Sequence, residues 1–95
     1  MEEKRKNELA RPALAKVEGA FEVLRVWIGP ESHEIVLNTT WPDPGAWGVL
    51  LVDIARQVAR AFGEEGKPTE QEALARIREL FDMEWQTPTT ESEGE

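Results

Sequence analysis

The chain has 95 residues, 40% of them hydrophobic and 32% charged, with no cysteine and a formal net charge of −8. This length and composition predict one small globular domain with a single core, and the lack of cysteine excludes disulfides and thiolate metal sites. The acidic balance argues against nucleic-acid binding, and no apolar run is long enough for a signal peptide or a membrane span, so we expect a cytoplasmic protein.

The first segment, residues 1–18, mixes charged and small residues and contains Pro12. No helical or strand period continues through it. We therefore predict a flexible arm, in which Leu9, Ala10, Ala13 and Leu14 are the side chains able to dock locally.

Residues 20–28 are rich in β-branched and aromatic side chains and predict a β-strand. The stretch GPESH, residues 29–33, predicts a hairpin turn, and residues 34–40 predict a second strand. Because side chains alternate across a strand, both faces of the first strand are largely apolar. One face is expected to carry Leu24, Val26 and Ile28, and the other Phe21, Val23, Arg25 and Trp27.

Residues 44–62 predict the central helix, because their apolar side chains recur at steps of three, four and seven. Asp43 is expected to cap the first turn, and Gly63 is expected to end the helix in a left-handed conformation. Its apolar stripe is expected to form the core of the domain, and it consists of Trp47, Leu50, Leu51, Ile54, Val58, Ala61 and Phe62.

A second helix is predicted over residues 70–84, because Thr69 and Glu72 have the spacing of a capping box. The short connection predicts an antiparallel αα-hairpin. The acidic residues 87–95 contain no core-forming side chain and predict a disordered tail. The expected fold is therefore α+β, a ββαα domain over residues 19–86. The apolar stripe of the second helix consists of Ala73, Leu74, Ile77, Leu80, Phe81 and, at its end, Trp85.

The segments WPDPGAWGVLLVDIAR, residues 41–56, and EALARIRELFDMEW, residues 72–85, resemble a family of short uncharacterised proteobacterial proteins, grouped as a domain of unknown function. The resemblance covers roughly residues 20–88 and leaves out both tails. It implies a ββαα domain, and it implies neither an activity nor site residues.

Few residues in this sequence suggest chemistry. His33 is the only histidine, and in a hairpin turn beside Ser32 it is expected to be exposed and not catalytic. Neither a metal nor a cofactor is expected, because the acidic residues are scattered and no second histidine or cysteine exists.

An interaction surface is the better hypothesis. Arg56 and Arg60 lie one helical turn apart, where they either form a solvated face with Asp53 or bind a carboxylate or small anion, and Arg25 admits the same interpretations. Tryptophan is favoured at interfaces, and Trp41 either seals the domain edge or reaches a partner. The candidate surface residues are Arg25, Trp27, Trp41, Arg56 and Arg60.

The favoured function is a non-enzymatic protein–protein interaction module, bacterial and self-associating as a homodimer. The alternatives are a module that binds a small anion and an accessory subunit of an enzyme. A homodimer is expected because two helices can cover one face of the hairpin only, which leaves the other face and both edges free. Pairing of edges and stacking of faces both remain open, as does a monomer in which the arm covers the second face.

Overall fold

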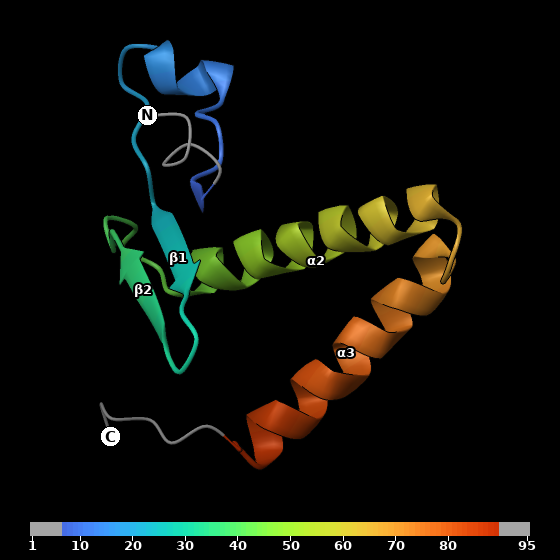
Figure 1. Cartoon of the computed structure of the whole chain (residues 1–95). Helices are drawn as coiled ribbons and strands as arrows, with labels where there is room; N and C mark the ends of the chain where they lie inside the picture. Colours follow the sequence, from blue (N-terminus) through green and yellow to red (C-terminus); the bar gives the residue numbers. More distant parts are fainter. Residues whose placement is uncertain (1–6, 90–95) are drawn as a thin grey trace. The chain divides into compact units, whose positions relative to one another are not determined.

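The computed structural model describes residues 7–89, and the chain divides after Pro42 into two compact units (Figure 1). The start of the predicted arm and the end of the predicted tail, residues 1–6 and 90–95, lie outside the described residues. The element order confirms the predicted α+β fold, a β-hairpin followed by two helices. In chain order the elements are η1 (Ala13–Lys16), β1 (Leu24–Ile28), β2 (His33–Leu37), α2 (Gly45–Glu65) and α3 (Glu70–Gln86).

The first unit contains the β-hairpin, in which β1 and β2 form a two-stranded antiparallel sheet. The turn is closed by a hydrogen bond of 2.7 Å from the Gly29 amide to the Ser32 carbonyl oxygen. The register places Val26 opposite Ile35, so these side chains share a face, as the alternation predicts.

Both strands are shorter than predicted. β1 begins at Leu24 instead of residue 20, and β2 ends at Leu37 instead of residue 40. The final bond of the ladder joins the Asn38 amide to the Val23 carbonyl oxygen at 3.0 Å. Strand propensity alone cannot extend a strand beyond its partner, so the apolar residues before Val23 stay outside the sheet.

The second unit begins with α2, whose start agrees with the prediction and whose end does not. The Asp43 carboxylate accepts a hydrogen bond of 2.9 Å from the Gly45 amide. The helix continues through Gly63, and Gly66, with φ 95°, is the left-handed residue that ends it. Gly63 instead allows a close approach of the two helices, because a Cβ there would lie 3.0 Å from both the nitrogen and the Cβ of Glu70. The missing side chain lets α3 start close to α2.

The beginning of α3 is fixed by the predicted capping box. The Glu72 amide donates to the Thr69 hydroxyl at 3.1 Å, and the Thr69 amide donates to the Glu72 carboxylate at 3.0 Å. Both bonds satisfy amides that have no partner inside the helix, so the first residue of α3 has a defined position.

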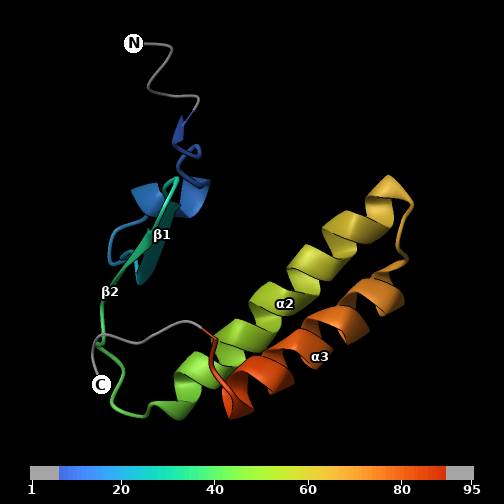
Figure 2. The same cartoon turned by 60° about the horizontal axis from the view of Figure 1, so that its bottom comes forward.

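Small residues form the most buried part of the contact between the helices, which pack against each other as the predicted αα-hairpin (Figure 2). Ala59 is completely buried and Ala73 is 4% exposed, and no other described residue is buried. Ala55, Ala59 and Gly63 follow one another at steps of four, so α3 covers a line of small side chains on α2.

The predicted apolar stripe of α2 is only partly covered by α3. Ile54 is 37% exposed, and Val58 and Phe62 are more exposed still. The prediction that these side chains form the core is therefore wrong for the helical unit. The reason is that α3 packs on the alanines of α2 that lie beside the stripe. The unit therefore leaves a broad apolar surface on α2.

Candidate interaction surfaces

One face of the hairpin consists entirely of aliphatic side chains apart from His33 at its end. Directly opposed residues share a face, as Leu24 and Leu37 do. Val26 and Ile35 are 48% and 54% exposed. A two-stranded sheet needs such a face to be covered before it is stable in water. We call this set the aliphatic face: Leu24, Val26, Ile28, Ile35 and Leu37.

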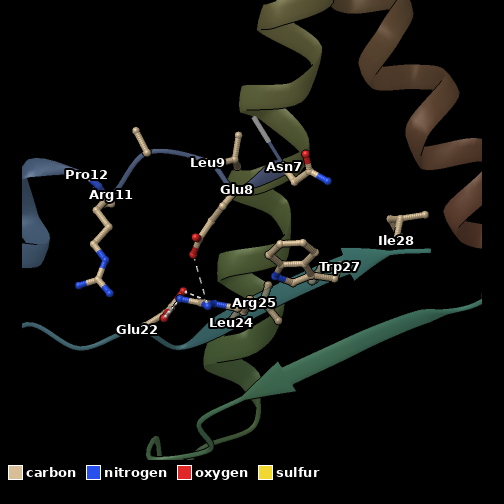
Figure 3. Close-up of a pocket in the computed structure, with 12 residues that line it drawn as sticks. Asn7, Glu8, Leu9, Arg11, Pro12, Glu22, Leu24, Arg25, Trp27 and Ile28 are labelled. Atoms are coloured by element: carbon tan, nitrogen blue, oxygen red, sulfur yellow. Dashed lines mark hydrogen bonds and ion pairs between the residues drawn. The ribbon is translucent and has the colours of Figure 1, made fainter. Parts of the chain in front are cut away.

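The described part of the arm leaves most of the aliphatic face exposed. Leu9 and Leu14, the side chains expected to dock, are 93% and 66% exposed. Residues 7–12 instead lie along β1, beside the Arg25 and Trp27 side chains (Figure 3). The segment and the strand together line a groove of about 520 Å³.

The groove contains a small charge cluster around Arg25. Its guanidinium donates two hydrogen bonds, of 3.0 and 3.2 Å, to the Glu22 carboxylate, and it lies 3.6 Å from a Glu8 carboxylate oxygen (Figure 3). Donation to the Glu22 carboxylate, together with its negative charge, raises the pKa of Arg25 above its ordinary value. Two carboxylates already face this one guanidinium, so an external anion would have to compete with both.

The second arginine group lies on α2. Arg56 and Arg60 are exposed, one helical turn apart. The Asp53 carboxylate, expected to pair with Arg56, instead accepts a hydrogen bond of 3.4 Å from the side-chain amide of Gln57. Within residues 7–89 no salt bridge involves Arg56 or Arg60. This pair keeps its positive charge available for an acidic partner or a small anion.

The remaining candidates are Trp41 and His33. Trp41 is partly buried, in the connection between β2 and α2. The predicted turn position of His33 is wrong, because His33 pairs with Ile28 as the first residue of β2. The turn is one residue shorter than its composition suggested, and His33 is exposed at the strand end.

The candidate residues therefore fall into separate groups. Arg25 and Trp27 lie on one face of β1, whereas Arg56 and Arg60 lie on α2 in the other unit. Glu8 is the member of the Arg25 cluster that the sequence does not indicate, because it is distant from Arg25 in the chain and follows no periodic pattern.

Two other kinds of site are absent from the described residues. Among residues 7–89 no group of three or more histidine, cysteine or acidic side chains is placed to hold a metal ion. Within the same residues no helix has the length and apolar character that crossing a bilayer requires.

Comparison with known families identifies the chain. The model of the family described as Domain of unknown function (DUF5076) matches residues 8–89. The chain belongs to this family. The DUF5076 match spans the hairpin and both helices, which agrees with the resemblance seen in the sequence. No protein with a curated description matches the chain.

A solved structure with the same fold comes from the photosynthetic bacterium Rhodopseudomonas palustrus CGA009. It is described as that of "a putative pyruvate dehydrogenase". The two sequences are 39% identical, the alignment covers 94% of this chain and 92% of that one, and the TM-score is 0.72. The two chains are therefore similar over nearly their full lengths.

Proposed function

We propose that this DUF5076 protein is a non-enzymatic interaction module of the cytoplasm that works as a homodimer. The observation that carries the proposal is the burial within each of the two units, since Ala59 and Ala73 are the only residues between positions 7 and 89 that their own unit buries. A domain of this length normally buries well over half of the surface that its unfolded chain exposes. The aliphatic face and the apolar surface of α2 exceed what a monomer leaves in water, so they are suited to contact another molecule.

A second copy is the simplest partner for such surfaces. Most soluble oligomers are symmetric homodimers, in which the same patch on each subunit is covered. An aliphatic patch without a charge at its centre is complementary to itself, whereas a specific foreign partner is usually recognised through charged or polar groups. The polar groups that this chain does offer, Arg56 and Arg60, remain available for such a partner.

The proposal predicts a mass of twice the 10.8 kDa chain in light scattering across a dilution series. Dissociation at the lowest concentrations should be accompanied by loss of helical circular dichroism, because the exposed apolar surfaces stabilise the fold only when covered. A fully folded monomer at every concentration would contradict the proposal and would mean that the chain covers its own apolar surfaces.

A second candidate function, an accessory subunit of a pyruvate dehydrogenase, is supported by the description of the Rhodopseudomonas protein. In that role the chain would supply contacts to a larger enzyme. We expect purified protein to elute with a purified pyruvate dehydrogenase complex in size-exclusion chromatography. Arg56→Glu combined with Arg60→Glu should abolish elution with the complex if the arginine pair makes the contact, whereas separate elution of the unmodified protein would exclude this candidate.

A further inference from the structure

The outer edge of β2 has free backbone hydrogen-bonding groups at every second residue. The bonds from Gly29 to Ser32 and from Asn38 to Val23 fix which pairs of the ladder are hydrogen-bonded. The pairs between them alternate, so the intervening β2 residues direct their amides and carbonyls away from β1. Within the described chain these groups have no backbone partner. They belong to His33, Ile35 and Leu37.

The two edges of the hairpin are not equivalent. Residues 7–12 lie along β1, and Glu8 reaches Arg25 there. No described segment of the first unit lies along β2 in the same way. The free groups of β2 also belong to residues whose side chains are on the aliphatic face, and proline and lysine, which commonly protect an edge, are absent from β2. The β2 edge is therefore the less obstructed of the two.

The register of this edge is complementary to itself. Ile35 is the middle residue of β2, so a two-fold axis beside it would pair Ile35 with its own copy and His33 with Leu37 of the partner subunit. All three of the free positions would then lie in hydrogen-bonded pairs, and none would be left over.

We propose that two copies pair antiparallel through β2, with Ile35 at the two-fold axis. This geometry rests on the self-association proposed above. The product is a four-stranded sheet in the order β1, β2, β2 and β1. The aliphatic faces of the two hairpins become one continuous surface, because directly paired residues share a face. Edge pairing satisfies the free backbone groups of β2, and it joins the aliphatic faces without covering them. Val26 and Ile35 would form a single row across the sheet with the partner's Ile35 and the partner's Val26.

Charge substitution at Ile35 tests this geometry. Across the two-fold axis the two copies of residue 35 are about 5.5 Å apart between Cα atoms, as in any hydrogen-bonded antiparallel pair. Ile35→Lys or Ile35→Glu alone would place like charges opposite each other and replace an apolar cross-strand pair, so each variant should dimerise about 10-fold more weakly. An equimolar mixture of the two should form a heterodimer, detected by native mass spectrometry, because opposite charges then face each other.

Val36→Lys is the matched control, because Val36 is the next residue of the same strand and is 62% exposed, close to the 54% of Ile35. Its backbone faces β1 and its side chain lies on the opposite face, so its dimer should remain intact. Weak homodimers of both Ile35 variants without a heterodimer in the mixture would overturn the edge geometry, as would unchanged homodimers. A monomeric unmodified protein would instead refute the proposed self-association itself.

Discussion

Ala59→Leu is expected to destabilise the αα-hairpin more than any other single aliphatic substitution in it. Ala59 is completely buried where α3 packs on α2, so the added side chain can be accommodated only if the helices move apart. Overpacking of this kind costs about 3 kcal/mol, against a total stability of about 5 to 14 kcal/mol for a domain of this size. Urea titration followed by circular dichroism, at one fixed protein concentration, measures the change.

Ala75→Leu provides the control for Ala59→Leu. It makes the same change in the same helical pair, but Ala75 is exposed on α3, and leucine and alanine have similar helix propensities. Its urea midpoint should remain close to that of the unmodified protein. Equal losses for the two variants would show that the helices do not make their closest contact along the line of small residues.

Two glycines of α2 are expected to respond to the same substitution with opposite signs. A Cβ at Gly48 would meet no atom within 4 Å, so Gly48→Ala should stabilise the protein by up to about 1 kcal/mol through helix propensity. At Gly63 the new Cβ would lie 3.0 Å from the nitrogen and the Cβ of Glu70. The Thr69 capping box holds that part of α3 in place, so Gly63→Ala should cost about 1 to 3 kcal/mol in spite of the better propensity.

Thermal and urea unfolding of the two glycine variants decide this prediction, with the unmodified protein as reference. Stabilisation by both substitutions would mean that α3 shifts easily at its start and that the absence of a side chain at Gly63 has no structural role. Destabilisation by both would mean that Gly48 makes a contact that the helical unit alone does not provide.

The features that the sequence predicts correctly are those decided by neighbouring residues. The alternation in β1, the Asp43 cap and the capping box of Thr69 and Glu72 each depend on side chains a few positions apart. The αα-hairpin follows from the short connection between the helices. These local signals were sufficient for the order and type of every strand and α-helix between positions 7 and 89.

The features that the sequence predicts wrongly depend on which other segments each part of the chain contacts. Gly63 and Gly66 carry the same local signal for a helix end, and only the place where α3 begins decides between them. Hydrophobic periodicity gives most weight to large side chains, so it selects Ile54 and not Ala59 as the contact residue, although helices approach most closely where side chains are small.

The candidate interaction surfaces were predictable only in part, as the fold was. Alternation indicated the aliphatic residues of β1, and the helical period indicated the exposed pair Arg56 and Arg60. The pairing of Glu8 with Arg25 joins positions far apart in the sequence, and the free edge of β2 depends on the register. Neither property has a signal in the sequence, because both arise only when the hairpin has formed.

The close approach of Gly63 to Glu70 has a consequence for chain entropy. The two residues are near neighbours in the sequence, so closing the loop between them restricts few backbone angles and removes little conformational freedom. The left-handed Gly66 and the capping box restrict the same short stretch from both sides. Ordering the stretch between Gly63 and Glu70 therefore costs little conformational entropy, and it depends on contacts within that stretch alone. The aliphatic face is the opposite case, because its ordering is repaid only when a second surface comes to lie against it.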